Sequence, residues 1–87
     1  MEFYRSSRFE RHFKKLPASI RAQAATRLVL FARDPFNPLL NNHPLHGVHK
    51  DKRSINVTGD YRIVYREVEE GVALLIDIGT HNELYGK

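Results

Sequence analysis

The sequence predicts an α+β domain: an N-terminal strand, a helical hairpin, then a three-strand antiparallel meander. Three observations support this fold class. Apolar residues recur at helical spacing in the first third, a Pro- and Asn-rich segment interrupts the middle, and short apolar runs separated by turn residues follow. With 87 residues, the chain is expected to form one domain over residues 1–87, with its helices packed on one face of the sheet.

The first elements are a short strand over residues 2–5 and a helix that ends at Pro17, which cannot donate the required backbone hydrogen bond. Ser7 and Glu10 have the spacing of a capping box, so Ser7 is the expected N-cap. Apolar residues at helical spacing follow, and these are Phe9, Phe13 and Leu16.

A second helix is predicted over Ala18–Ala32, a segment rich in Ala, Arg, Gln and Leu. The Asp34-Pro35 pair ends it, because a residue before proline disfavours helical dihedral angles. A loop over residues 35–44 follows. The expected buried stripe of this helix is Ile20, Ala24, Leu28 and Phe31.

Three strands are predicted in the second half, over Arg53–Val57, Tyr61–Glu67 and Val72–Ile78. Turn residues at 58–60 and 69–71 separate them, and such short connections imply antiparallel pairing. The third strand is apolar on nearly both faces, so we expect it in the interior of the sheet.

The composition limits the classes of function. The chain has no cysteine, which favours a reducing compartment and excludes Cys-based zinc sites and a Cys nucleophile. It begins without an apolar signal region, and no apolar stretch approaches the ~18 residues of a membrane span. We therefore expect a cytoplasmic protein that does not engage a membrane.

A formal net charge of +4 is compatible with a polyanionic partner, and equally with a merely basic surface. Cations concentrate on and near the predicted strands, and tyrosines among them could stack on unpaired bases. The alternative is a solvated strand face with half-buried tyrosines. The cations are Lys50, Lys52, Arg53, Arg62 and Arg66, and the tyrosines are Tyr61, Tyr65 and Tyr85.

Four of the five histidines lie from His43 onward, and histidine suits acid–base chemistry on a phosphodiester. Spacing of three and three at His43, His46 and His49 also suggests a metal site, but the intervening Pro44 and Gly47 disfavour a regular helix. We expect His46 and His49 to be exposed bystanders. His12 is expected to be exposed without a function, and Glu83 to be a solvated tail charge.

Four motifs in the second half resemble the RelE/ParE toxin superfamily, and most closely its YafQ-like (RelE/StbE) branch of toxins from type II toxin–antitoxin modules. The resemblance covers nearly the whole chain. Its most specific part is the Gly-Thr-His ending, which favours the nuclease branch. The motifs are Leu45-His46-Gly47, Arg53-Ser54-Ile55, Gly59-Asp60-Tyr61-Arg62-Ile63-Val64-Tyr65, and Gly79-Thr80-His81 with Leu84-Tyr85.

The resemblance implies a ribosome-dependent mRNA endonuclease that inhibits translation and requires no metal or other cofactor. Such toxins cut messenger RNA in the ribosomal A site. A cognate antitoxin neutralises them, in a hetero-oligomeric complex that can bind operator DNA through the antitoxin.

The resemblance also implies roles for individual residues. His81 is the expected general acid, Asp60 the base or the orienter of a base, and His43 a further candidate for acid–base work. Asn56 stands where the branch has a second histidine, and it cannot shuttle a proton. Tyr85 would position a base or the scissile phosphate.

The remaining site residues are expected to bind RNA. Arg62, together with Arg53, would contact the phosphate, and Lys50 and Lys52 the RNA backbone. The full expected RNA-binding set is Lys50, Lys52, Arg53, Asn56, Tyr61 and Arg66.

Two other functions fit the sequence. A ParE-type toxin would share the fold and inhibit DNA gyrase through protein contacts, which would make the histidines dispensable. A decayed toxin would act as a non-catalytic binding module, and Asn56 is the residue that best supports this alternative.

Overall fold

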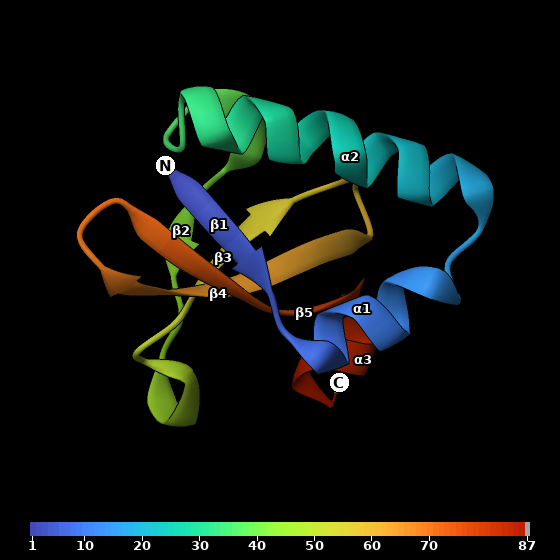
Figure 1. Cartoon of the computed structure of the whole chain (residues 1–87). Helices are drawn as coiled ribbons and strands as arrows, with labels where there is room; N and C mark the ends of the chain where they lie inside the picture. Colours follow the sequence, from blue (N-terminus) through green and yellow to red (C-terminus); the bar gives the residue numbers. More distant parts are fainter. Residues whose placement is uncertain (87) are drawn as a thin grey trace.

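A computed structural model describes residues 1–86 and contains one five-stranded mixed sheet with helices packed on it (Figure 1). The strands are β1 (Glu2–Arg5), β2 (His43–Pro44), β3 (Arg53–Asn56), β4 (Tyr61–Glu69) and β5 (Val72–Thr80). Their order across the sheet is β1-β5-β4-β3-β2. The predicted α+β class and the antiparallel meander are confirmed.

The N-terminal strand β1 pairs in parallel with β5, with Glu2 opposite Val72 and Arg5 opposite Leu75. All other pairs in the sheet are antiparallel. As expected for its apolar sequence, β5 is an interior strand, with β1 on one side and β4 on the other. Strands β4 and β5 each extend two residues beyond the predicted ends, since their pairing continues to the turn and to α3.

Helix α1 spans Ser7–Lys14, so Ser7 is its first helical residue and not the predicted N-cap. Ser6 is the N-cap: its backbone is extended, and its side-chain oxygen accepts a hydrogen bond from the Phe9 amide at 3.1 Å. The predicted capping box is therefore wrong, because Glu10 stands one position too far along to complete it. Glu10 lies instead 3.8 Å from the Arg5 guanidinium.

Helix α2 (Ala18–Arg33) covers one face of the sheet, above the strands in Figure 1. Three of the four residues predicted for its buried stripe, Ala24, Leu28 and Phe31, are buried, and Ile20 is half-buried. The Phe31 ring meets the buried Tyr65 of β4 edge-on, with ring centroids 4.8 Å apart. The rest of this core includes Phe9, Leu40, Ile55, Val57, Ile63, Ala73, Leu75 and Ile78.

The opposite sheet face carries a row of cross-strand neighbours, Ser54, Val64 and Asp77, which alternate with core residues. A short helix that the sequence analysis did not predict, α3 (His81–Tyr85), lies against this face. Thr80 is its N-cap, and Glu83 completes a capping box with it. Glu83 is exposed, as expected for a solvated charge, but it also caps α3, which the sequence analysis did not predict.

Helix α1 is held to the final strand by two polar contacts. The His12 Nδ1 atom lies 2.6 Å from the Asp77 carboxylate, and the Ser6 hydroxyl donates to the Ile76 carbonyl at 2.9 Å. The His12 side chain is 42% exposed, but the sequence analysis did not predict its contact with Asp77. Its partner lies 65 residues away in the sequence, and helical spacing alone does not reveal such a contact.

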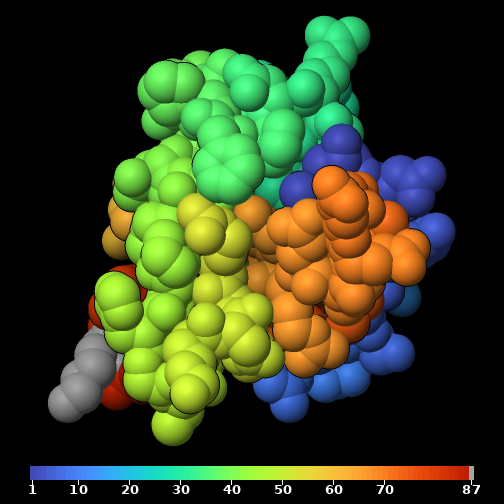
Figure 2. All heavy atoms as spheres, turned by 90° about the vertical axis from the view of Figure 1, so that its left-hand side faces the viewer, coloured from blue at the N-terminus to red at the C-terminus, as the bar shows by residue number. Residues whose placement is uncertain are grey.

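The segment from residues 41 to 52 is more ordered than a plain loop. It contains the two-residue strand β2 and a 3-10 helix over Gly47–His49. Figure 2 shows this segment (yellow-green) beside the β4–β5 hairpin (orange), with α2 above them. None of the helices within residues 1–86 has the length and apolar character needed to cross a membrane.

Candidate functional site

A cavity of about 390 Å³ lies between the 41–49 segment, α3 and the α3-side face of the sheet. Four of the five histidines line it, together with an arginine and a tyrosine. We call this cavity the histidine pocket. Its lining residues are Asn41, His43, Leu45, His46, His49, Ser54, Arg62, His81 and Tyr85.

Helix α3 places His81 and Tyr85 in the histidine pocket. The Thr80 hydroxyl accepts from the Glu83 amide at 3.2 Å, and the Glu83 carboxylate accepts from the Thr80 amide at 2.8 Å. These bonds fix the first turn, where His81 is the first helical residue. Tyr85 follows one turn later, with its ring centroid 4.7 Å from that of His81.

The close packing around Gly79 explains why the Gly-Thr-His motif begins with glycine. A Cβ atom at this position would lie 2.9 Å from the Glu83 Oε1 atom and 3.3 Å from its Cβ. A larger residue would therefore displace the carboxylate that caps α3. In the Gly-Thr-His motif, Gly79 leaves room for the Glu83 carboxylate, Thr80 is the N-cap of α3, and His81 is the first residue of the helix.

The other pocket histidines come from β2 and from the segment between β2 and β3. His43 pairs with Ser54 across the sheet edge, and its Nδ1 atom lies 2.8 Å from the Asn41 carbonyl. Gly47, with a φ of +65°, starts the turn that returns His49 toward α3. The His49 ring reaches the Tyr85 ring edge-on at 5.9 Å. The sequence analysis expected His46 and His49 to be exposed bystanders, but both line the pocket and His49 is partly buried.

Three buried polar atoms on this side of the sheet have no hydrogen-bond partner within residues 1–86. They are the Ser54 hydroxyl, the Tyr85 hydroxyl and the Asn56 side-chain oxygen. An unpaired buried polar group costs roughly 1–3 kcal/mol. Ser54 and Tyr85 belong to the histidine pocket, so a polar ligand there would gain donors and acceptors that the protein leaves unused.

Arg62 supplies a fixed positive charge beside these atoms. Its Nη1 atom donates to the backbone carbonyls of Thr58, Gly59 and Tyr61 at 3.0, 2.9 and 3.2 Å. The guanidinium is thus anchored to the β3–β4 turn while the residue lines the pocket. This arrangement can hold an anion without first ordering a flexible side chain.

Not all expected site residues reach the pocket. Arg53 pairs with the buried Tyr65 in the strand register, which turns it toward the α2 side. There its Nε atom donates to the Asn42 side chain at 2.8 Å, and its guanidinium lies 5.2 Å from the Phe36 ring centroid. Asp60 is exposed in the turn, and Tyr61 packs against the core cluster.

The other expected RNA-binding cations flank the pocket around Asp51. Lys52 Nζ lies 3.1 Å and Arg66 Nη1 3.6 Å from the Asp51 carboxylate oxygens. The hydrogen bond from Lys52 lowers the pKa of the Asp51 carboxyl below its usual value. Lys50 is exposed at the end of the 3-10 helix.

Within residues 1–86, no three His, Asp or Glu side chains are grouped in a way that would hold a metal ion. The expectation of chemistry without a metal stays a prediction, since a ligand set can also form when an ion binds.

The five-stranded mixed sheet with helices packed on it matches the fold of RelE-like toxin structures. The chain is similar to the crystal structure of YafQ from E. coli strain BL21(DE3), with a TM-score of 0.79 and 21% identity over 98% of both chains. It is similar to a YoeB/ParE toxin from Agrobacterium tumefaciens, with a TM-score of 0.77 and 21% identity over 93% of this chain and 99% of the other. The RelBE2 toxin–antitoxin complex from Mycobacterium tuberculosis has a TM-score of 0.72 at 22% identity, over 92% and 96% of the two chains.

Residues 1–86 match the family described as "Bacterial toxin of type II toxin-antitoxin system, YafQ". The chain belongs to this family and is a type II toxin. No curated protein sequence is significantly similar to it.

Proposed function

We propose that this toxin is a metal-independent endoribonuclease that cleaves messenger RNA in the ribosomal A site and so inhibits translation. The observation that carries the proposal is the histidine pocket. It combines four histidine side chains, a residue type suited to acid–base chemistry, with a fixed guanidinium and buried polar atoms that lack a partner within residues 1–86.

Cleavage without a metal requires three functions. A base removes the proton of the ribose 2′-hydroxyl, and the resulting oxygen attacks the adjacent phosphorus. An acid protonates the departing 5′-oxygen, which leaves a 2′,3′-cyclic phosphate and a 5′-hydroxyl. A cation stabilises the charge on the crowded phosphate. Histidines suit the first two functions and Arg62 the third.

We assign the acid to His81, which α3 holds at the pocket wall next to Tyr85. The base is better sought among His43, His46 and His49 than at Asp60, because the loop histidines line the same cavity and Asp60 does not. Asn56 would bind the phosphate through its amide group. Tyr85 would hold the scissile phosphate with its unpaired hydroxyl.

We further propose that a cognate antitoxin binds this toxin in a hetero-oligomeric complex that contacts operator DNA through the antitoxin. Two similar solved structures hold more than the toxin alone: one is the DinJ-YafQ complex from E. coli, and the other is the RelBE2 toxin–antitoxin complex from Mycobacterium tuberculosis. The proposed target places the toxin in the cytoplasm, where ribosomes translate the message.

Primer extension on a translated message after toxin induction tests the proposal. The wild type should produce cuts confined to ribosome-occupied codons. His81→Ala should abolish the cuts and the growth arrest. Lys14→Ala, which removes an exposed cation on α1 away from the histidine pocket, serves as the matched control and should cut normally.

Growth arrest with an intact message would contradict the proposal, and induction of the DNA-damage response would then favour a ParE-type toxin that inhibits DNA gyrase. Full cleavage by His81→Ala would contradict the assigned acid. Absence of both toxicity and cleavage in the wild type would favour a non-catalytic binding module.

A further inference from the structure

Three neighbouring cavities surround α3 and share their walls. The histidine pocket shares His49 and Tyr85 with a second cavity of about 180 Å³. This second cavity shares Asp77 and Leu84 with a third of about 350 Å³. The three cavities thus adjoin one another in a row from the 41–49 segment, past α3, to α1, and we call this row the groove.

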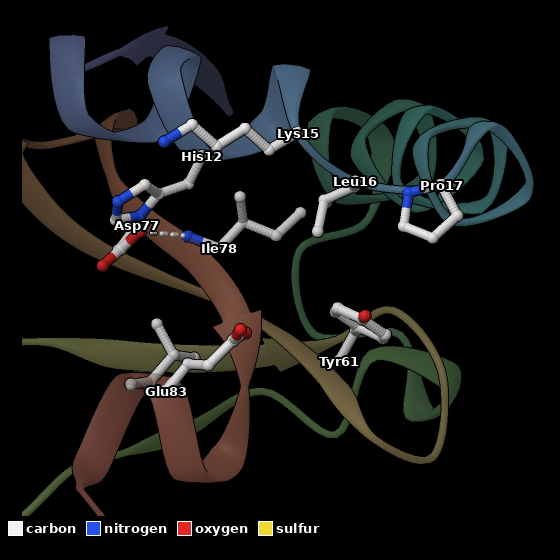
Figure 3. A pocket seen from close by; sticks show the side chains of 9 residues that line it. His12, Lys15, Leu16, Pro17, Tyr61, Asp77, Ile78 and Glu83 are labelled. Carbon is white, nitrogen blue, oxygen red and sulfur yellow. Dashed lines mark hydrogen bonds and ion pairs between the residues drawn. The ribbon is translucent and has the colours of Figure 1, made fainter.

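Cations from separate parts of the chain lie along this groove. Arg8 of α1 and Lys52, which precedes β3, line the second cavity, although 44 positions separate them in the sequence. Lys15 and Tyr61 line the third cavity. Figure 3 shows this cavity between α1 and α3, with His12 beside Asp77 on one side and Tyr61 on the other.

The carboxylates of the groove are already engaged by protein groups. Asp77 Oδ1 lies 2.6 Å from His12 Nδ1 and accepts from the Ile78 amide at 2.8 Å. Glu83 caps α3 through the Thr80 amide. Their negative charge is partly offset by these donors, whereas no hydrogen bond or ion pair of the Arg8 side chain occurs within residues 1–86.

We propose that this groove binds single-stranded RNA, and that Arg8 and Lys52 form a phosphate subsite directly next to the cleavage pocket. The inference rests on the proposed function and adds a second binding site for the same strand. A groove that combines cations with aromatic rings suits a single strand, because the cations follow the backbone and the rings stack on bases. Since both cavities share Tyr85 and His49, the phosphate at Arg8 and Lys52 would flank the scissile one.

Fluorescence anisotropy with a labelled single-stranded RNA of roughly ten nucleotides tests the subsite. The measurements use His81→Ala as the background, so that the probe stays intact. Arg8→Ala and Lys52→Ala should each weaken binding several-fold. Each should also lower the slope of log affinity against log salt by about 0.7, the value for one lost phosphate contact on a single strand.

Arg11→Ala is the matched control, because Arg11 lies on the same helix with the same charge but does not line the groove. It should weaken binding far less than Arg8→Ala. Arg8→Lys should restore most of the affinity, and Arg8→Gln, which keeps the aliphatic part of the side chain, should not. Thermal melting of each variant separates lost binding from lost folding.

Equal effects of Arg8→Ala and Arg11→Ala would overturn the subsite, as would failure of the background protein to bind the RNA. A third outcome is that Arg8→Ala weakens binding of polyglutamate but not of RNA. That outcome would overturn the RNA subsite and assign the groove to an acidic protein. Failure of the proposed function can be distinguished from failure of the subsite. If the toxin leaves the message on the ribosome intact, the anisotropy measurements still report whether Arg8 and Lys52 bind RNA.

Discussion

The Tyr85 hydroxyl is buried in the histidine pocket without a partner, which makes it the clearest residue for separating stability from activity. Tyr85→Phe removes the unpaired hydroxyl and keeps the ring between His49 and His81. We expect the free energy of unfolding to stay the same or to rise by up to about 1 kcal/mol, since an unpaired buried group is lost. Cleavage should fall about tenfold, equivalent to roughly 1.4 kcal/mol of lost transition-state stabilisation. Urea denaturation and single-turnover cleavage measure the two effects, and a stability loss with unchanged cleavage would contradict the assignment.

In the proposed RNA complex, Asp51 would compete with RNA for two cations, because its carboxylate lies near both Lys52 and Arg66. Asp51→Asn should therefore tighten RNA binding by about two- to threefold, a small effect because exposed ion pairs are weak. The pKa of Asp51 is lowered, so the carboxylate is charged at neutral pH and becomes neutral only as the pH falls through that lowered value. The difference between wild type and variant should disappear over that acidic range. Anisotropy measured across pH checks this, and a difference that persists after neutralisation would argue against charge competition.

At the residue scale, sequence reasoning placed His43, Arg62, His81 and Tyr85 in one site, and the structure brings these four to one cavity. It did not foresee the direction of Arg53, because a side chain's face depends on strand register, and register depends on the partner strand. The sequence analysis also did not predict that His46 and His49 line the same cavity as His43. The turn at Gly47 that gathers these side chains has a positive φ and is closed by backbone hydrogen bonds, such as that from the Lys50 amide to the Gly47 carbonyl.

At the element scale, α3 is five residues long and depends on its cap, so disturbing the cap should move His81. Gly79→Ala should displace the Glu83 carboxylate and reduce cleavage, as should Glu83→Ala, which removes it. Because both changes act on the same contact, Gly79→Ala should have little further effect in the Glu83→Ala background. A double-mutant cycle on cleavage rate measures this coupling, and additive losses would refute the shared mechanism.

The His12–Asp77 contact joins α1 to β5, and Asp77 is mostly buried, with 17% of its side chain exposed. Asp77→Ala should lower the free energy of unfolding by roughly 1–3 kcal/mol, since it leaves the Ile78 amide and His12 without their acceptor. His12→Ala should cost less in the Asp77→Ala background than in the wild type. Chemical denaturation checks both statements, with the exposed Arg11→Ala as the control that should stay near wild-type stability.

The elements with strong local signals were predictable. Helix α2 and the β3–β5 meander follow from periodicity and turn residues. Helix α3 was missed because five residues carry no periodicity, although Thr80 and Glu83 already have the spacing of a capping box. The N-cap of α1 was ambiguous because Ser6 and Ser7 are adjacent, and only the hydrogen bond to Phe9 distinguishes them. The parallel pairing of β1 with β5 has no local sequence signal at all.

At the scale of the whole molecule, the net charge of +4 should make RNA binding depend strongly on salt. If Arg8, Lys52 and Arg62 each contact one phosphate, the slope of log affinity against log salt should be about −2 for a single strand. Anisotropy titrations between low and moderate salt measure this slope. A slope near zero would mean that phosphate contacts do not drive binding, and the groove would then need a different ligand.

The parallel pairing of β1 with β5 has a consequence for how the toxin is made. Strand β1 finds its partner only after residue 72 has been added, and His81 follows that partner directly. A nascent chain that stops before residue 72 lacks both the strand that pairs with β1 and the helix that presents His81. A chain of that length therefore lacks a complete histidine pocket. The order of the strands delays assembly of the pocket until β5 and α3 have been made.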